Sequence, residues 1–347
     1  MLNRVYRLVA PRTIEPVETC VPLEEGTVVV RPTHLSICNA DMRYWLGRRP
    51  AEVLARKLPM ALIHEGIGRV VYDPSEMLAS GTQVVMVPNE PAPAGLGEPA
   101  DEIIAENYRY TSRFRGSGFD GFMQELVALP ARCAVPLPEG LDPHVAAFTE
   151  IVSVAVHAAT RFDAIAHERR GTIGVWGDGN MGLIVSLVLR ILQPESHIVV
   201  FGRSAYKLAD FTFADATYLT DAVPAGLEVD HAFECCGGEG SASAIAQIIS
   251  CIRPEGTISL LGVSENPPAI DTRMVLEKGL RLFGSSRSGL ADFERTVELY
   301  RAHPEVPAYL QALVGDVICV RGVRDMAAAF DADLRKPMGK TIMEWNV

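Results

Sequence analysis

The sequence predicts an α/β protein that joins a mostly β domain to a domain with a doubly wound parallel sheet. Its 347 residues exceed what one hydrophobic core usually serves, because single cores stop growing near ~250 residues. Residues 1 to about 150 carry short β-type runs broken by Gly, Pro and Asn, which is typical of an irregular antiparallel domain. From about residue 171, apolar β-type runs alternate with helical stretches, which indicates parallel βαβ units.

The end of the chain is expected to return to the first domain. After about residue 288, a helical stretch (ADFERTVELYRAH) precedes mixed segments that finish in GKTIMEW. We therefore predict a catalytic domain from residues 1–150 and 288–347, and a nucleotide-binding domain from residues 151–287. Within the first domain, a loop region rich in Pro, Gly and charge runs from Asn89 to about Asp120.

Composition limits the partners of this protein. Its net charge of -11 and pI near 5.3 disfavour nucleic acid and anionic membranes, which would be repelled. No run of ~18 uncharged apolar residues occurs, and the N-terminal segment lacks the apolar stretch of a signal sequence. The seven cysteines show no spacing typical of a disulfide framework. We expect a cytoplasmic protein without a membrane anchor.

A glycine-rich motif predicts a dinucleotide site. GDGNMG follows the strand-like TIGVW and opens the apolar helical run MGLIVSLVLRIL. In this context Gly177 can turn the chain, Gly179 can let main-chain amides approach a pyrophosphate, and Gly182 can permit close helix-sheet packing. Asn180 and Met181 start the helix, whose N-terminus favours a diphosphate.

The next strand favours NADP over NAD. HIVVFG ends in Gly202, where an NAD enzyme would carry Asp or Glu for the ribose 2′-hydroxyl. Arg203, Ser204 and Lys207 follow, and cations with a hydroxyl suit a 2′-phosphate. A solvated loop that happens to be basic is the alternative interpretation.

A second group of residues predicts a zinc site. Cys38, His64 and Glu65 supply a thiolate, an imidazole and a carboxylate, which suit Zn²⁺ with an open coordination position. Singly, such residues are more often core or structural ones. Asp41 could accept the second N–H of His64, and Glu150 is the candidate fourth ligand.

The summed negative charge of these donors limits how many of them can bind zinc at the same time. If Cys38, Glu65 and Glu150 all bound as anions, their charge would exceed that of Zn²⁺, so we expect one carboxylate to yield to water or substrate. Zinc would polarise a carbonyl, or lower the pKa of an alcohol, while a nicotinamide exchanges the hydride at the attached carbon.

On these motifs the chain resembles the zinc-containing medium-chain dehydrogenase/reductase family. SICNAD around Cys38, HEGIGRV at His64 and Glu65, and TEIVSVAVHA at Glu150 are similar to its zinc-ligand segments, the last in the polyol-dehydrogenase branch. GDGNMG and FECCGG resemble its coenzyme motifs, and LLGVS, which contains Gly262 and Val263, resembles the stretch that passes the nicotinamide. The resemblance implies a GroES-like catalytic domain and a Rossmann domain.

Within that family the chain is most similar to the ribulose-5-phosphate reductases. The stretches that carry this likeness include VYRLVAPR, SICNADMRYW, KLPMALIHEG, GVWGDGNMG and GSSRSG. The resemblance implies NADPH-dependent reduction of D-ribulose 5-phosphate to D-ribitol 5-phosphate, which feeds CDP-ribitol for teichoic acid or capsule. It also implies a bacterial cytoplasm, a homodimer and a cytidylyltransferase as downstream partner.

Two departures from the wider family bear on zinc and proton transfer. Residues 88–132 contain no cysteine, whereas many members bind a structural zinc there through four cysteines, so we expect one catalytic zinc and no structural zinc. Ala40 and Arg43 stand where many members carry a hydroxyl and a histidine of a proton relay. Tyr44, Glu65 and zinc-bound water are the remaining candidate proton donors.

The replacement at Arg43 points to a substrate phosphate, because a guanidinium binds phosphate better than it passes protons. Arg287 in GSSRSG is a second candidate, and Lys57, Arg113 and Arg115 are weaker ones.

Two other functions stay open: an NAD-dependent catabolic polyol dehydrogenase, and a non-catalytic dinucleotide-binding protein. The intact set of Cys38, His64 and Glu65 argues against the second.

Overall fold

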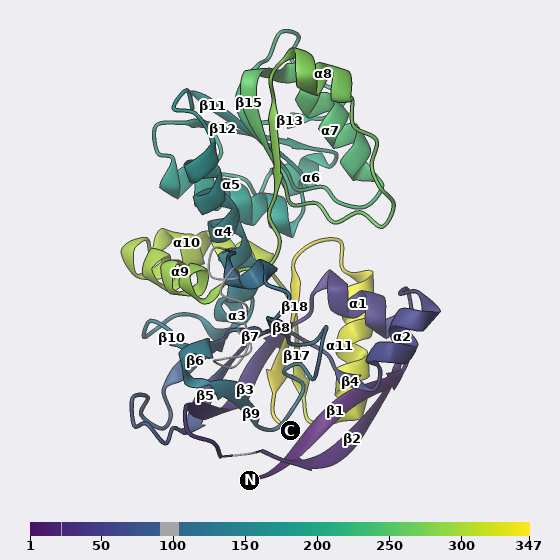
Figure 1. Cartoon of the computed structure of the whole chain (residues 1–347), viewed down its shortest axis with the longest axis vertical. Helices are drawn as coiled ribbons and strands as arrows, with labels where there is room; N and C mark the ends of the chain where they lie inside the picture. The colour runs from purple at the N-terminus through teal and green to yellow at the C-terminus, as the bar shows by residue number, and fades with distance from the viewer. Residues whose placement is uncertain (22, 91–103) are drawn as a thin grey trace. The chain divides into compact units, whose positions relative to one another are not determined.

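The computed structural model describes residues 1–21, 23–90 and 104–347, which divide into two compact units. Unit 1 comprises Met1–Ser153 and Ser288–Val347, and unit 2 comprises Val154–Arg287 (Figure 1). Residues 91–103 of the loop expected between Asn89 and Asp120 lie outside the described residues. The domain boundaries at 150/151 and 287/288 stay a prediction.

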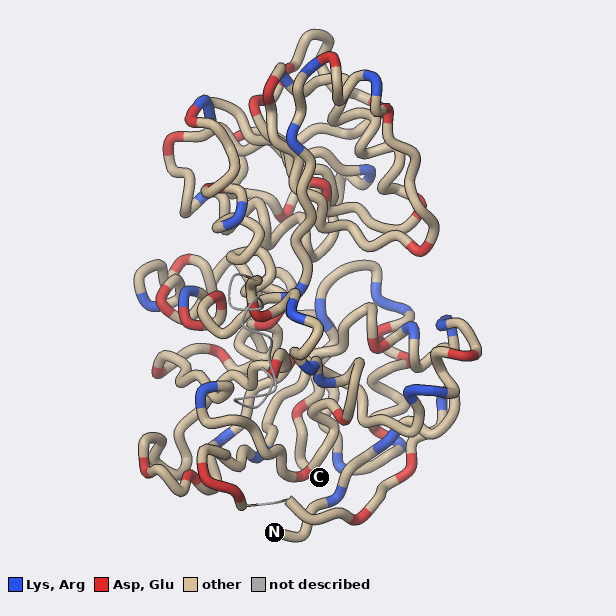
Figure 2. The backbone as a smooth tube through the Cα atoms, in the orientation of Figure 1, with Lys and Arg blue, Asp and Glu red and all other residues tan. Residues whose placement is uncertain are grey.

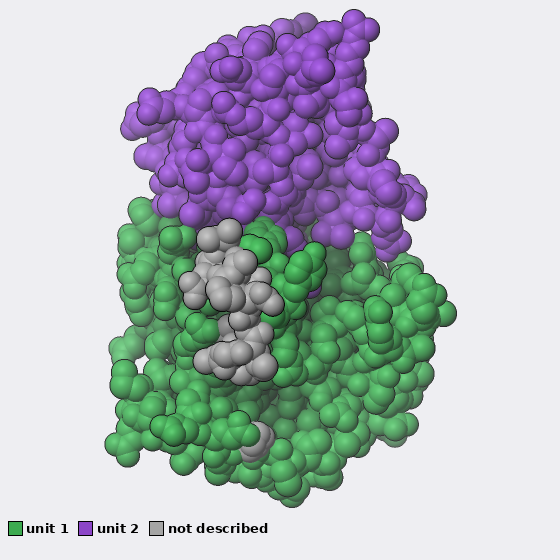
Figure 3. Space-filling view, in the orientation of Figure 1, with its two compact units in different colours: residues 1–153, 288–347 green, residues 154–287 purple. Residues whose placement is uncertain are grey.

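Acidic and basic residues are interspersed over both units (Figure 2), which are coloured separately in Figure 3. Within the described part of the chain, every helix is too short or too polar to span a bilayer.

Unit 1 is built mainly from strands. Their bounds are β1 (Leu2–Ala10), β2 (Thr13–Cys20), β3 (Thr27–Ser36), β4 (Met60–Ala61), β5 (Glu65–Tyr72), β6 (Gln83–Met86), β7 (Asn89–Glu90), β8 (Arg113–Phe114), β9 (Val127–Pro130), β10 (Ala134–Pro136), β17 (Val314–Val320) and β18 (Lys340–Trp345). One sheet has the order β2-β1-β4, and a larger sheet has the order β10-β6-β5-β3-β18-β17 with β9 beside β3. β7 pairs with β8.

Helices flank the strands of unit 1. They are α1 (Asn39–Trp45), α2 (Ala51–Lys57), α3 (Pro143–Ala146), α9 (Leu290–Ala302), α10 (Glu305–Leu310) and α11 (Val323–Arg335), with short 3-10 turns η2 (Glu106–Tyr108), η3 (Ala131–Cys133) and η4 (Gln311–Leu313). α4 (Thr149–Ile165) begins in unit 1 and ends in unit 2.

The C-terminal strand completes the large sheet of unit 1. β18 pairs antiparallel with β3, which places Ile342 opposite Ser36 and Glu344 opposite His34. The sequence GKTIMEW therefore returns to the first part of the chain, as its position after the helical stretch indicated. This pairing brings the last residues of the chain beside the strand that leads into Cys38.

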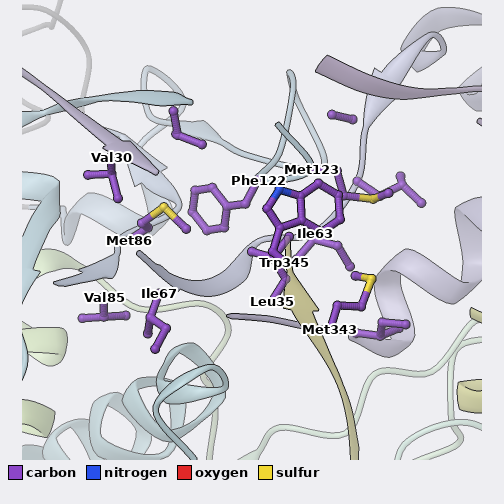
Figure 4. Packing of buried hydrophobic residues seen from close by; sticks show 14 of the residues in the cluster. Val30, Leu35, Ile63, Ile67, Val85, Met86, Phe122, Met123, Met343 and Trp345 are labelled. Atoms are coloured by element: carbon purple, nitrogen blue, oxygen red, sulfur yellow. The ribbon is translucent and has the colours of Figure 1, made fainter. Parts of the chain in front are cut away.

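An apolar core holds the sheet of unit 1 together. Leu35, Ile67, Val85 and Met86 are fully buried, and Trp345 and Phe122 lie in the same cluster (Figure 4). The Trp345 indole N–H donates to the main-chain oxygen of Gln124 at 2.8 Å, so its polar atom is satisfied inside the core. Dense packing of this kind fixes the relative positions of β3, β5 and β18.

Unit 2 is a parallel sheet with helices. Its elements are β11 (Thr172–Trp176), α5 (Asn180–Leu192), β12 (His197–Gly202), α6 (Ala205–Leu208), β13 (Ala216–Leu219), β14 (Val229–Glu234), α7 (Gly240–Cys251), β15 (Ile252–Leu260), α8 (Thr272–Glu277) and β16 (Arg281–Gly284). The strand order is β13-β12-β11-β14-β15-β16, and every pair is parallel. The predicted α/β class with a doubly wound sheet is confirmed. In such sheets the direction of winding reverses beside the first strand, and dinucleotides bind at its carboxyl end.

Candidate metal and dinucleotide sites

Cys38, His64 and Glu65 converge in unit 1. One donor atom from each lies within 4.8 Å of the others; His64 and Glu65 are buried and Cys38 is partly buried. Cys38 caps the start of α1 just after β3, and β5 begins at Glu65. Because Ser36 lies opposite Glu65 in the β3–β5 pair, residues far apart in sequence meet where β3 ends and β5 begins. The fit of these donors to zinc is good, since a thiolate, an imidazole and a carboxylate form an accepted ligand set.

Asp41 organises this site through the main chain. Its carboxylate accepts the N–H of Cys38 at 3.0 Å and the N–H of Ile63 at 3.0 Å. The separation of His64 Nδ1 from Asp41 Oδ1 is 3.8 Å, longer than the hydrogen bond expected from the sequence. Ile63 has a φ of 70°, a rare conformation for a β-branched residue. Asp41 thus stabilises the strained residue that precedes His64, and stays close enough to interact with the ring electrostatically.

A buried ion pair fixes Glu65. Lys340 Nζ lies 2.8 Å from Glu65 Oε1 and 2.7 Å from Oε2, and Ser36 Oγ donates to Oε2 at 2.7 Å. All three side chains are buried. Burial opposes a charged lysine, but the Glu65 carboxylate outweighs it and raises the pKa of Lys340. The ion pair therefore offsets one negative charge among the anionic donors.

Glu150 belongs to the same buried group of charges. It lies in the first turn of α4 and is 5% exposed. Burial raises its pKa to about 7, with His64 and Lys340 opposing and Glu65 adding to the rise. Burial alone would lower the pKa of His64, but Asp41, Cys38 and Glu150 raise it well above its ordinary value. Glu150 thus acts on the imidazole electrostatically, although it is not among the donors that converge within 4.8 Å.

The other candidates of unit 1 have different surroundings. Tyr44 is buried, and its ring lies under the guanidinium of Arg49 at 5.0 Å and near Lys57 Nζ at 5.9 Å. Arg43 is half-buried in the last turn of α1. Arg115 is buried against Glu90, with a 2.6 Å hydrogen bond from Nε, and is therefore engaged in packing. The guanidinium of Arg113 stacks on the Phe119 ring at 3.9 Å.

The glycine motif of unit 2 forms the turn between β11 and α5. Gly177 has a φ of 140°, and a Cβ there would lie 2.9 Å from the main chain of Cys235. A Cβ on Gly182 would lie 1.9 Å from the Gly177 oxygen, so only glycine fits. Gly179 is the N-cap of α5, which Asn180 and Met181 open. The helix presents free N–H groups at this turn, as a pyrophosphate site requires.

The candidate 2′-phosphate loop is held by a residue that sequence reasoning did not select. Asp178 Oδ2 accepts the N–H groups of Arg203 at 2.7 Å and Ser204 at 2.8 Å. A cavity of about 400 Å³ in unit 2 is lined by residues that include Gly177, Gly179, Arg203 and Lys207. The glycine turn and the basic loop therefore face one cavity, whose lining does not include Ser204, Asn180, Met181 or Gly182.

Gly262 and Val263 lie after β15, beside the carboxyl end of β14. Glu234, which is buried, accepts N–H groups from Cys236 at 3.0 Å, Gly237 at 3.1 Å and Gly262 at 3.0 Å. Val263 is 62% exposed. One carboxylate thus joins the two loops at the ends of β14 and β15. Arg287 lies beyond β16, in a left-handed conformation with a φ of 60°.

Comparison with known proteins assigns the family. Residues 24–139 match the alcohol dehydrogenase GroES-like domain, and residues 182–302 match the zinc-binding dehydrogenase family. The chain is 51% identical over 347 residues to the ribulose-5-phosphate reductase of Bacillus spizizenii, covering 100% of both chains. It is 49% identical over 345 residues, 99% of each chain, to ribulose-5-phosphate reductase 1 of Staphylococcus aureus. The chain belongs to the zinc-dependent medium-chain dehydrogenase/reductase family.

A solved structure agrees with the fold. The crystal structure of S. aureus TarJ in complex with NADPH matches with a TM-score of 0.88 and 44% sequence identity, covering 100% of both chains. The expected GroES-like and Rossmann folds are thereby confirmed.

Sequence reasoning on this dehydrogenase missed four residues that hold the candidate sites: Ser36, Lys340, Asp178 and Glu234. Asp178 carried a signal, since it lies inside the glycine motif. Glu234 also carried one, because a carboxylate that ends an apolar strand needs donors. Ser36 and Lys340 carried none, because Ser36 meets Glu65 only through the pairing of β3 with β5, and Lys340 reaches it only through the pairing of β3 with β18.

Replacing Glu150 by Gln should remove a pH dependence of stability in the zinc-free dehydrogenase. The folded pKa of about 7 exceeds the ordinary value of 4.5, so between these values the folded chain keeps a proton that the unfolded chain has lost. Stability contributed by the protonated carboxyl is therefore lost as pH rises. Between about pH 5 and about pH 8, the unfolding free energy of wild type should fall by on the order of 2 kcal/mol relative to Glu150→Gln, measured by urea unfolding.

The exposed Glu294→Gln serves as the matched control and should follow wild type at every pH. A wild-type curve that runs parallel to that of Glu150→Gln would contradict this electrostatic account of the site.

Proposed function

We propose that this chain uses NADPH to reduce D-ribulose 5-phosphate to D-ribitol 5-phosphate. The observation that carries the proposal is the convergence of Cys38, His64 and Glu65 within 4.8 Å, in a chain that matches ribulose-5-phosphate reductases along its full length. The cavity that joins the glycine turn to Arg203 and Lys207 supports NADP(H) as coenzyme, as does the NADPH complex of S. aureus TarJ.

The proposed metal site consists of Cys38, His64, Glu65 and Glu150. Bound zinc would polarise the substrate carbonyl at C2, which favours hydride addition to that carbon. The Lys340 contact already neutralises Glu65, so Cys38 and Glu150 together balance the two positive charges of the ion. Glu65 is then the carboxylate best placed to give way to substrate. We infer one catalytic zinc per chain and no structural zinc of the four-cysteine kind.

In this proposal Glu65 also carries the proton, and arginines bind the phosphate of the substrate. Glu65 receives hydrogen bonds from Ser36 and Lys340, whereas the Tyr44 ring is enclosed under Arg49, which favours Glu65 as proton carrier. Arg43 and Arg287 are alternative residues for the substrate phosphate.

The oligomeric state, the compartment and the downstream enzyme are inferred from the likeness of the chain to the same reductases. We infer a homodimer in a bacterial cytoplasm, and the seven free cysteines suit a reducing compartment. A cytidylyltransferase would convert the product to CDP-ribitol for teichoic acid or capsule.

Substrate preference tests the proposal. NADPH oxidation should be fast with D-ribulose 5-phosphate and slow with D-ribulose and D-fructose, because a lost charge-assisted phosphate contact costs roughly 10- to 100-fold. Arg43→Ala should raise KM for the phosphorylated sugar by a similar factor and leave the rate with D-ribulose unchanged. Arg56→Ala, at an exposed position on α2, is the control. Equal rates on phosphorylated and unphosphorylated sugars would refute the assignment.

Coenzyme preference tests the basic loop separately. Arg203→Asp should weaken NADPH binding by roughly 10- to 100-fold and spare NADH, because the carboxylate repels a 2′-phosphate but accepts from a 2′-hydroxyl. Fluorescence titration with both coenzymes measures this, and Arg203→Lys should stay close to wild type. If wild type preferred NADH, the catabolic polyol dehydrogenase would become the better assignment.

A further inference from the structure

A second cluster of metal-type donors lies in unit 1, separate from the residues assigned above. One ring nitrogen each of His34 and His144 and a carboxylate oxygen of Glu344 lie within 4.8 Å of one another. All three side chains are partly buried, with those of His144 and Glu344 29% and 37% exposed. Such a group is accessible to an ion from solvent and shielded enough to hold it.

The fold brings these residues together from three elements. His34 and Glu344 are directly opposite each other in the antiparallel pair of β3 and β18. His144 lies in the first turn of α3, whose N-cap Asp142 accepts the His144 N–H at 2.8 Å. The second oxygen of Asp142 accepts from Gln311 at 2.8 Å. Both the strand register and the helix cap therefore fix the donors in place.

The spacing of the donors within the cluster is compatible with an ion site. His144 Nε2 lies 3.1 Å from Glu344 Oε1, close to the ~3.3 Å that separates two donors on one tetrahedral zinc. Its other nitrogen, Nδ1, lies 3.2 Å from Asp142 Oδ1. Metal-bound histidines commonly use such a carboxylate to orient the ring.

His34 adds a buried polar atom that the network does not use. Its Nδ1 is buried and has no hydrogen-bond partner among the described residues. The ring lies edge-on to that of His144, with 5.3 Å between centroids. A His–Glu hydrogen bond would explain the pair of His144 and Glu344 on its own, but it gives no role to His34, the second imidazole of the cluster.

We propose that His34, His144 and Glu344 bind a divalent transition-metal ion, with zinc the best fit to two imidazoles and one carboxylate. Water would complete the coordination, since the site is open to solvent. The ion would link α3 to β3 and β18, the strands that carry Ser36 and Lys340 around Glu65. Its role is structural support of the candidate catalytic site, and it is independent of which substrate the enzyme reduces.

Metal counting in the full chain tests this site. Protein stripped with chelator is reloaded with Zn²⁺, passed through a desalting column and analysed for zinc by mass spectrometry. Wild type should retain two ions per chain, and Cys38→Ser, which disables the other site, should retain one. Cys38→Ser combined with His144→Gln should retain none. Glu344→Gln in place of His144→Gln should also lose the ion, which guards against a misfolded variant.

Thermal unfolding supplies a second readout. Added Zn²⁺ should raise the melting temperature of Cys38→Ser and leave that of Cys38→Ser/His144→Gln unchanged, because only ligands of the folded state stabilise it. The control is Cys38→Ser/His303→Gln, which changes a more exposed histidine paired with Glu305 and should behave like Cys38→Ser. Absence of zinc from Cys38→Ser, or its retention after His144→Gln, would overturn the proposal.

Discussion

The buried ion pair between Lys340 and Glu65 is the interaction on which the candidate active site depends. Cys38, Glu65 and Glu150 place several potential anions in one poorly hydrated region, and such charges cannot be buried together without compensation. Lys340 supplies an internal cation that is present before any metal binds. The ion pair also gives a reason for the return of β18 to β3, because the pairing of these two strands brings Lys340 to the site.

In both units, carboxylates shape the loops by accepting hydrogen bonds from main-chain N–H groups. Asp41 accepts two main-chain N–H groups in unit 1; in unit 2, Asp178 accepts two and Glu234 accepts three. Each carboxylate gathers N–H groups that loops would otherwise leave unsatisfied, which sets the direction of the neighbouring side chains. Fixed main-chain geometry at strand ends helps to position His64, whose buried ring also packs against Phe114, and Arg203.

The sequence predicted what local patterns control. HIVVFG forms β12 with the expected bounds, and the helix that GDGNMG opens begins at Asn180, because strand periodicity and glycine spacing act over a few residues. The set of Cys38, His64 and Glu65 was also found from residue types and family motifs. The partners of these residues were not found from sequence: Lys340 follows Glu65 by 275 residues and meets it only through strand order. The same is true of His34 and Glu344, which nothing in their local sequence connects.

The proposed chemistry requires a metal ion bound beside a charge-balanced carboxylate, and anomalous X-ray diffraction from crystals of zinc-loaded protein tests for that ion most directly. Data collected on both sides of the zinc absorption edge should give a peak ~2.3 Å from Cys38 Sγ and ~2.0 Å from a ring nitrogen of His64, with Lys340 still in contact with Glu65. Absence of zinc density between Cys38 and His64 in crystals that bind zinc elsewhere would contradict the account.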